Sequence, residues 1–349
     1  MGTSQTEPIT RGFNASWTRE REEMRLKRTN KRHVFTAMFI YLLSIELLSA
    51  HAFAARNPRI AFTTTRHGHG EIYVMDADGG NQKRLTRNKV KDWGPTLSPD
   101  GRKIAFVTGR TPLKIQIYVM DSDGSNQERL TDGWHDNWPS WSPDGQKIAY
   151  WSLVIADKTP GIYVMDSDGG NRTKLKDNPV TTLSWSPDSQ RIAFVSKLKE
   201  GTEIYAMNAD GTNVVRLTYD LAFKGLPSWS PDGQNIAFSG KIGGNMEIFV
   251  VSPDGERLKK LTENGARDYY PSWSPDGQLI AFVSDRNAGF RDQIHAMTAD
   301  GEYLEQLSDL HLENDVDPDW LNPGLLPVFP NSKQVTIWGR LKNLAPDLR

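Results

Sequence analysis

The chain has 349 residues, with 42 basic and 43 acidic side chains and no cysteine. A formal net charge of −1 argues against a general nucleic-acid-binding surface, which carries a basic excess. The absence of cysteine excludes disulfides, thiolate catalysis, cysteine-ligated metals and a lipid anchor on cysteine. The 29 glycines and 20 prolines are spread along the chain, which favours many short strands joined by turns.

The N-terminal segment predicts export. Basic residues gather at 25–33, and a largely apolar run follows at 34–48. Ala52 and Ala54 then place small side chains where a signal peptidase requires them, so residues 1–54 are predicted to be a signal peptide that is cleaved before Ala55. The alternative is an uncleaved membrane anchor. It is disfavoured because the run is shorter than the roughly 20 apolar residues that span a bilayer and contains Glu46.

Met24 is a second candidate for the initiator residue. The residues before it are polar and differ from the basic start of a signal peptide. With either start, we expect a mature protein that is periplasmic or secreted and has no stable membrane span after cleavage.

A sequence repeat organises the chain beyond this segment. Ser-Pro-Asp recurs at a constant spacing of 44 residues, starting at Ser98, Ser142, Ser186, Ser230 and Ser274. In each unit an Ile-Ala-Phe-like triplet follows, then a strand-like segment that ends in an Asp-Gly turn, then a basic-Leu-Thr-like motif. In the second unit these are 104–106, 117–124 and 129–131. Four short strands in about 44 residues are typical of one blade of a β-propeller.

The two ends of the repeat predict how the ring closes. The first unit starts directly at Ile60 and lacks the Trp-bearing strand that opens every later unit. A matching segment, 315–320, lies at the other end of the repeat. We therefore expect an all-β fold, a six-bladed β-propeller in which this C-terminal strand completes the first blade and leaves no open sheet edge.

The repeat resembles the TolB-like six-bladed β-propeller family, with its Pro-x-Trp-Ser-Pro-Asp-Gly, Ile-Ala-Phe, Ile-Tyr-Val-Met-Asp and Arg-Leu-Thr motifs. The resemblance covers about residues 58–321 and leaves 322–349 as a C-terminal tail of unknown role. It implies a periplasmic, non-enzymatic role in which protein partners dock on the channel face. The α/β domain that precedes the propeller in that family has no counterpart in the five residues 55–59, so contacts made by that domain are not carried over.

Several motifs suggest chemistry, but each has a simpler explanation. The Asp-x-Asp-Gly runs, such as 76–79, lack the further ligands of an EF-hand and are interpreted as turns rather than calcium sites. His67 and His69 form a weak candidate metal pair, but incidental loop histidines explain them better. The sequence contains no nucleophile elbow, phosphate-binding loop, dinucleotide fingerprint or His-Glu-x-x-His motif. We therefore expect no enzyme activity, no cofactor and no bound metal.

The positions that differ between blades at one structural place are the best functional candidates. If the Trp-bearing strands are innermost, the side chains that begin them surround one mouth of the channel. The candidate partner-binding residues at this mouth are Asp92, Trp93, His135, Asp136, Trp138, Lys224, Arg267, Asp268, Tyr269, Tyr270 and Asp315, with Lys91, Trp134 and Phe223 beside them. Alternatively, each Asp caps its loop through backbone N–H groups, the aromatics pack between blades, or the carboxylates hold a cation.

The protein is predicted to be an exported scaffold that binds another envelope protein or peptide. It would contribute to envelope integrity or to Tol-like protein transport. We expect a monomer that binds no nucleic acid. The alternatives are a small metal-dependent propeller hydrolase and a sensor that binds a cell-wall or carbohydrate fragment, the latter favoured by the aromatic rim.

Overall fold

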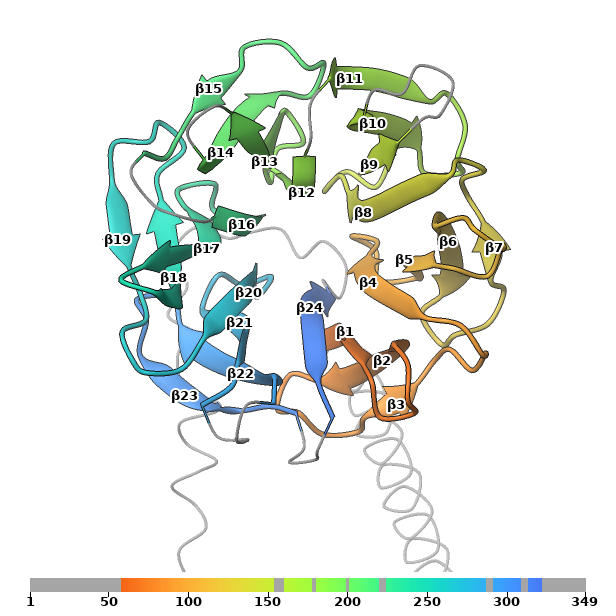
Figure 1. Cartoon of the computed structure of the whole chain (residues 1–349), viewed down its shortest axis with the longest axis horizontal. Helices are drawn as coiled ribbons and strands as arrows, with labels where there is room; N and C mark the ends of the chain where they lie inside the picture. Colours follow the sequence, from red (N-terminus) through yellow and green to blue (C-terminus); the bar gives the residue numbers. More distant parts are fainter. Residues whose placement is uncertain are drawn as a thin grey trace, which may run out of the picture. The chain divides into compact units, whose positions relative to one another are not determined.

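The computed structural model describes residues 58–153, 160–177, 180–198, 201–219, 224–286, 291–308 and 313–321. These residues form six four-stranded antiparallel sheets arranged around a central axis (Figure 1). The predicted signal segment 1–54 and the tail 322–349 lie outside the described residues. None of the described segments forms a helix long and apolar enough to span a bilayer.

Each sheet is one blade. Its four strands lie side by side, with the innermost strand at the channel and the outermost strand at the outer surface. The innermost strands of blades 1 to 6, in that order, are β24 (Asp315–Leu321), β4 (Asp92–Leu97), β8 (His135–Trp141), β12 (Val180–Trp185), β16 (Lys224–Trp229) and β20 (Asp268–Trp273). The second strands are β1 (Arg59–Thr64), β5 (Lys103–Thr108), β9 (Lys147–Leu153), β13 (Arg191–Leu198), β17 (Ile236–Ile242) and β21 (Leu279–Ser284). The third strands are β2 (Glu71–Asp76), β6 (Gln116–Asp121), β10 (Pro160–Asp166), β14 (Gly201–Asn208), β18 (Asn245–Val251) and β22 (Gln293–Thr298). The outermost strands are β3 (Lys83–Arg84), β7 (Glu128–Arg129), β11 (Thr173–Asp177), β15 (Val215–Arg216), β19 (Leu258–Lys260) and β23 (Tyr303–Gln306).

The ring closes as the sequence predicts. Strand β24 pairs antiparallel with β1, with Arg59 opposite Leu321 and Thr64 opposite Asp315. The first blade is therefore built from both ends of the repeat region, and every blade has four strands. This arrangement confirms the six-bladed propeller and its closure by the C-terminal strand.

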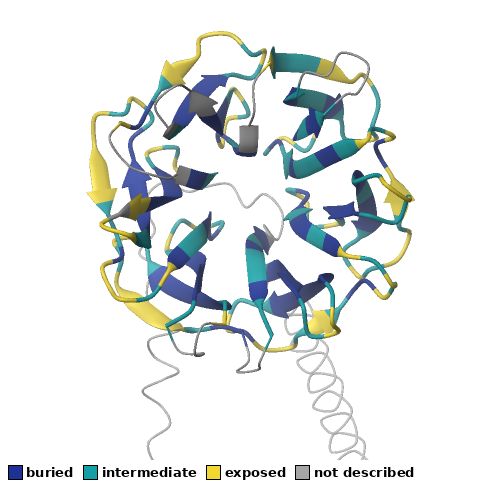
Figure 2. Ribbon diagram, viewed as in Figure 1, coloured by how far each residue is buried: buried dark blue, intermediate teal, exposed yellow. Residues whose placement is uncertain are grey.

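The hydrophobic core lies between the blades. Each cluster of buried side chains takes members from two neighbouring blades; at the closure, Ile60 and Phe62 of β1 pack with Ile294 of β22 and Trp320 of β24. The Ile-Ala-Phe triplets on the second strands are almost completely buried. Figure 2 shows these second strands as largely buried, while the outermost strands are mostly exposed and β11 is largely intermediate. A blade cannot bury both faces alone, so the core forms only when the blades stack around the axis.

The turns at one end of the ring, which we call the turn face, repeat from blade to blade; the Ser-Pro-Asp turn occurs in the five blades whose innermost and second strands are consecutive in the chain. In the Ser-Pro-Asp turn of blade 2, the Ser98 hydroxyl donates to Asp100 Oδ1 at 2.7 Å, and the Arg102 N–H donates to the same oxygen at 3.0 Å. In the Asp-x-Asp-Gly turn, the Gly80 N–H donates to Asp78 Oδ1 at 2.9 Å. These runs are therefore turns, as expected from the sequence.

The glycine of each Asp-x-Asp-Gly turn also joins neighbouring blades. Gly79 has φ +82°, and a Cβ atom there would lie 2.0 Å from the backbone oxygen of Leu307 in blade 6. Gly124 stands in the same relation to Leu85 of blade 1, at 2.9 Å. The glycine therefore satisfies both a left-handed backbone and a close contact with the Leu of the preceding basic-Leu-Thr motif.

The opposite end of the ring, which we call the loop face, varies from blade to blade. Here the innermost strands begin and the second strands pass to the third. That second-to-third connection spans 65–70, 109–115, 154–159, 199–200, 243–244 and 285–292 in the six blades. In repeat proteins, variation of this kind on one face is typical of the face that binds ligands.

Candidate functional site

A bulge in the innermost strands shapes the channel. The pairing register shifts in all six innermost strands, in five of them around the repeated proline, as between Trp93 and Thr96 in β4. The residue before that proline has a positive φ in these five strands: Gly94, Trp138, Leu226, Tyr270 and Asp317. A bulge re-aims a side chain, and a left-handed conformation costs a residue other than glycine roughly 1 kcal/mol or more. Such positions are functional candidates.

The bulged residues and their neighbours line a cavity of about 140 Å³ on the ring axis. Its lining includes a first ring that differs in every blade, formed by Gly94, Trp138, Thr182, Leu226, Tyr270 and Asp317. A second ring, two residues further along each strand, is nearly uniform: Thr96, Ser140, Ser184, Ser228, Ser272 and Asp319. The first ring therefore gives each blade a different side chain at the channel mouth. The second ring repeats nearly the same side chain in every blade.

The only carboxylates in these two rings come from β24. The Thr63 hydroxyl donates to Asp317 Oδ2 at 3.0 Å. The Leu97 N–H donates to Asp319 Oδ2 at 2.9 Å, much as the Trp229 N–H donates to Ser184 Oγ at 3.2 Å between other blades. Burial raises the pKa of Asp317, and it raises the pKa of Asp319 to about 6. The channel thus places two carboxylates where ionisation is unfavourable.

The four candidate aspartates that begin innermost strands have buried carboxylates. Asp92, Asp136, Asp268 and Asp315 are exposed by no more than 2%. Asp92 accepts from Arg110 at 2.8 Å, and Asp315 accepts from Arg66 at 3.0 Å. Asp136 caps its loop by accepting from the Gly133 N–H at 3.1 Å, whereas Asp92, Asp268 and Asp315 are held by Arg side chains. They fix the mouth rather than present their charge at its surface.

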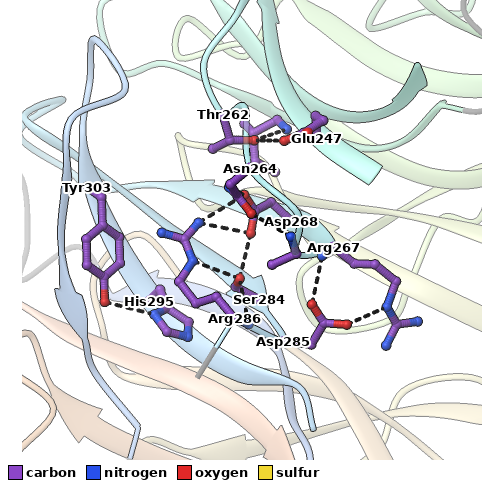
Figure 3. A network of polar contacts seen from close by, with 12 residues as sticks. Glu247, Thr262, Asn264, Arg267, Asp268, Ser284, Asp285, Arg286, His295 and Tyr303 are labelled. Atoms are coloured by element: carbon purple, nitrogen blue, oxygen red, sulfur yellow. Dashed lines mark hydrogen bonds and ion pairs between the residues drawn. The ribbon is translucent and has the colours of Figure 1, made fainter. Parts of the chain in front are cut away.

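Blade 6 shows this arrangement in most detail (Figure 3). Both oxygens of Asp268 accept from the Arg286 guanidinium, at 3.0 and 2.9 Å, and the Ser284 hydroxyl donates to Oδ1 at 2.6 Å. The Asn264 amide donates to Oδ2 at 2.6 Å. On the outer side, Arg267 forms a separate ion pair with Asp285 at 2.8 Å. The buried charge is thus fully paired, and the neighbouring Arg267, half exposed, remains accessible.

The other candidate residues lie around the mouth, and those whose side chains the structure describes are partly exposed. Trp93 lies beneath the Lys91 ammonium, 4.9 Å from the ring centroid. His135 meets Trp151 edge-on with centroids 5.3 Å apart, and the rings of Tyr269 and Tyr270 are 4.7 Å apart in the same way. Trp138 belongs to the first channel ring. Lys224 begins β16 at the equivalent place in blade 5, while Phe223 lies outside the described residues.

The hydroxyls of the two tyrosines at the mouth have raised pKa values. Burial, with the nearby Asp317 carboxylate, raises the pKa of the Tyr270 hydroxyl. Burial, with Asp292, raises the pKa of Tyr269. Both hydroxyls therefore stay protonated at neutral pH, and that of Tyr269 is hydrogen-bonded to Asp292.

The candidate metal pair does not converge. His67 Nδ1 lies 3.3 Å from the Tyr73 hydroxyl, whereas His69 Nε2 lies 2.8 Å from the backbone oxygen of Asn88 and 3.0 Å from Glu71. Within the described part of the chain, no group of three or more His, Asp or Glu residues is placed to hold a metal ion.

Sequence reasoning did not select Asp317 and Asp319. A signal was available, because alignment of the repeats puts Asp319 where four blades have Ser. It also did not select Leu113 and Lys114, which belong to a loop whose position depends on tertiary contacts. Likewise, no sequence motif predicts the bulge that directs the Asp317 side chain into the channel.

Comparisons with known proteins agree with this architecture. A family model described as the TolB beta-propeller domain matches residues 44–152 and 222–337. A protein TolB homolog from Chlorobium chlorochromatii is 47% identical over 58 residues, which is 16% of this chain and 13% of that protein. A Tol-Pal system protein TolB from Geobacter sulfurreducens is 48% identical over 46 residues, 13% of this chain and 11% of that protein. The chain thus matches only a small part of each of these relatives.

Solved structures extend the likeness at the level of the fold. TolB from Acinetobacter baumannii superposes with a TM-score of 0.67 and 24% identity, covering 75% of this chain and 66% of that one. An oligogalacturonate lyase from Vibrio parahaemolyticus has a TM-score of 0.51 and 15% identity, covering 71% of this chain and 74% of that one. Because the same fold is found in a lyase, function has to be argued from the site.

Proposed function

Because this chain belongs to the TolB β-propeller family, we propose that it is a protein-binding scaffold of the cell envelope. Its partner docks on the loop face, over the mouth of the central channel. The observation that carries the proposal is the contrast between the faces: the turn face repeats the same turns, while the loop face presents different side chains in every blade. Scaffold requirements explain repetition but do not explain this variation.

The side chains at the mouth fit protein recognition. Trp138 and Tyr270 project from a rigid backbone into the channel lining, and Tyr269 and the half-exposed Arg267 lie beside Tyr270. Aromatic and Arg side chains are the residue types that dominate protein–protein hot spots. Buried aspartates hold the start of the innermost strand in place in four of the six blades, so a partner meets a largely preorganised surface.

An envelope location is part of the same proposal. It rests on the signal-like segment 1–54 and on the name of the Geobacter relative, a Tol-Pal system protein. A role in envelope integrity or in Tol-like protein transport is the proposed context. Binding rather than catalysis is proposed because the described residues place no convergent metal ligands at the mouth.

The test compares mouth variants with controls on the opposite face. Trp138→Gly and Tyr270→Gly remove the aromatic rings at positions with φ +55° and +59°, where blade 2 already has Gly94. Gln146→Ala and Gln278→Ala alter exposed side chains in turns of the turn face. Full-length protein is cross-linked in cells and its envelope partners are identified.

We expect a partner that is recovered with the wild type and with both controls, and reduced at least about tenfold with the mouth variants, as is typical of hot-spot truncation. Equal recovery with the mouth variants would contradict docking at the mouth. Circular dichroism and thermal unfolding establish that every variant is folded.

A further inference from the structure

The loop that joins β5 to β6 exposes an unusual leucine. In the turn 111–114, the Lys114 N–H donates to the Thr111 oxygen at 3.0 Å, and Leu113 has φ +60°. Proline followed by a residue with positive φ is the pattern of a type II turn, in which glycine ordinarily occupies the second position. Leu113 therefore carries backbone strain, and its side chain is 90% exposed. Neither feature helps this blade to fold.

Hydrogen bonds hold this loop firmly to its two neighbours. At one end the Gly109 N–H donates to the Lys91 oxygen at 3.3 Å. At the other end the Ile115 N–H donates to the Trp134 oxygen at 2.9 Å, and the Asp136 N–H donates to the Ile115 oxygen at 2.8 Å. The loop is thus an ordered bridge from the start of β4 to the start of β8.

Two lysines on this bridge and beside it lie over tryptophan rings. The Lys91 ammonium is 4.9 Å from the Trp93 ring centroid, and the Lys114 ammonium is 5.8 Å from that of Trp134. Trp134 is 47% exposed. We call the surface formed by Lys91, Trp93, Leu113, Lys114 and Trp134 the blade-2 rim. Its cations are held in place before a partner arrives, which reduces the entropy cost of binding.

The charge of this sector is unbalanced. Arg87 and Lys89 lie in the segment that leads into β4, next to Lys91. Among the described residues, neither these two nor Lys91 and Lys114 form an ion pair. Nearby carboxylates are already engaged: Asp92 with Arg110, and Asp132 with Arg172. The Asp317 carboxylate lies in the channel, close enough to feel the charge of Lys91.

We infer that the blade-2 rim binds an acidic peptide segment of the protein partner, with one apolar side chain of that segment packed against Leu113 and Trp134. The inference rests on the proposed function and names the chemistry of the partner on the same face. Acidic side chains would meet the lysines, and the apolar one would cover the exposed leucine.

An acidic polysaccharide is the other anionic polymer that stacked tryptophans and lysines could bind. The exposed Leu113 favours the peptide, because an aliphatic tip gains free energy by packing against another apolar side chain and offers nothing to sugar hydroxyls. The polysaccharide is therefore a competing outcome in the test.

The experiment selects binders from a displayed library of random peptides of about twelve residues, long enough to span a rim of this kind. The baits are the full-length wild type, a double variant Lys91→Glu with Lys114→Glu, and a control double variant Lys83→Glu with Lys259→Glu. The control lysines are exposed, and each donates to a backbone oxygen as Lys114 does, at 3.2 and 3.0 Å against 3.3 Å. Polygalacturonate is titrated against the same proteins.

A fourth bait, Leu113→Gly, separates recognition from folding. Glycine suits φ +60°, so this change relieves strain and removes only the apolar tip. We expect the wild type to enrich peptides rich in Asp and Glu with an apolar residue. The best peptide should bind about tenfold more weakly to the Lys91/Lys114 variant and to Leu113→Gly, and equally to the control, with affinity falling as salt rises.

Enrichment of neutral or basic peptides, or equal weakening in the control variant, would overturn the inference. Binding of polygalacturonate that is lost in the rim variants, without enrichment of acidic peptides, would replace the peptide with a polysaccharide. If the envelope partner is lost with Trp138→Gly and Tyr270→Gly but kept with the rim variants, the proposed function stands and this inference fails. If all variants retain it, docking at the mouth fails as well.

Discussion

Asp319 shows how one residue can depart from a repeated pattern at a cost. Four other blades have Ser at this place in the second channel ring and one has Thr. A serine hydroxyl can accept the hydrogen bond from the next blade without a charge, as Ser184 does. Asp319 makes the equivalent bond, but ionisation of its carboxyl group destabilises the folded state, because burial raises its pKa to about 6.

Asp319→Asn should therefore stabilise the protein at high pH more than at low pH. The folded pKa of about 6 lies above the ordinary value of 3.8, so the native state binds more protons than the unfolded state between these values. Wild-type stability then falls as pH rises through this window, by about 3 kcal/mol in all. Urea unfolding at pH 3.5 and pH 8 measures the effect. We expect the gain from Asn to be about 3 kcal/mol larger at pH 8 than at pH 3.5.

Asp100→Asn provides a control of opposite sign. Burial acts to raise the pKa of Asp100, but hydrogen bonds from Ser98 and Arg102 outweigh it and lower the pKa. The stability that Asp100 contributes is therefore present at neutral pH and lost in acid, so Asn should cost more at pH 8. A pH-independent difference for Asp319→Asn would show that its carboxylate is not destabilised by the channel.

At the scale of elements, the repeated turns hold one blade against the next. The sequence predicts that the Asp-x-Asp-Gly motif is a hairpin turn, and the structure confirms this. Its glycine also packs against the backbone of the preceding blade, with Gly79 of blade 1 against Leu307 of blade 6. A single motif thereby serves both the hairpin and the blade interface.

Gly79→Ala should separate these two roles when it is compared with Gly68→Ala. Both glycines have positive φ, +82° and +86°, so alanine costs roughly 1 kcal/mol of backbone strain at each. At Gly68 a Cβ atom meets nothing within 4 Å, whereas at Gly79 it would meet the Leu307 oxygen at 2.0 Å. We expect Gly79→Ala to lower the free energy of unfolding by about 2 kcal/mol more. If denaturant titration gave similar losses of unfolding free energy for both variants, the interface at Gly79 would accommodate the added methyl group without cost.

At the scale of the whole molecule, closure joins segments that are far apart in the chain. β24 pairs with β1, Trp320 enters the core between blades 6 and 1, and Arg66 pairs with Asp315. Because blades bury their faces only against neighbours, an open ring would leave two blade faces and an unpaired strand edge in water.

Truncation before Asp315 should therefore strongly destabilise the ring, and Trp320→Ala should lower the free energy of unfolding by about 3–5 kcal/mol. Trp320 is 6% exposed and its indole N–H donates to the Ser272 oxygen at 3.0 Å, so alanine leaves both a cavity and an unpaired acceptor. Calorimetry measures both. A melting temperature unchanged by the truncation would refute the closure model.

The sequence by itself determined the fold. A constant spacing of Ser-Pro-Asp, strand-forming triplets and Asp-Gly turns specifies blades through local interactions, and the incomplete first unit at Ile60 with its missing strand at 315–320 specifies the closure. Turns and the alternation of apolar side chains along strands can be predicted from a sequence, because each depends on residues only a few positions apart.

Only the tertiary structure decided which side chains at the mouth are available. Asp92, Asp136 and Asp268 lie beside aromatic residues in the sequence, but the carboxylates of these three and of Asp315 point toward Arg or Ser partners in the same blade. The bulges aim Trp138, Tyr270 and Asp317 into the channel, and the bridge 109–115 lifts Leu113 into solvent. These outcomes depend on contacts between segments 16 to more than 200 residues apart, as between Asp136 and Ser152 or Thr63 and Asp317, and no local pattern encodes them.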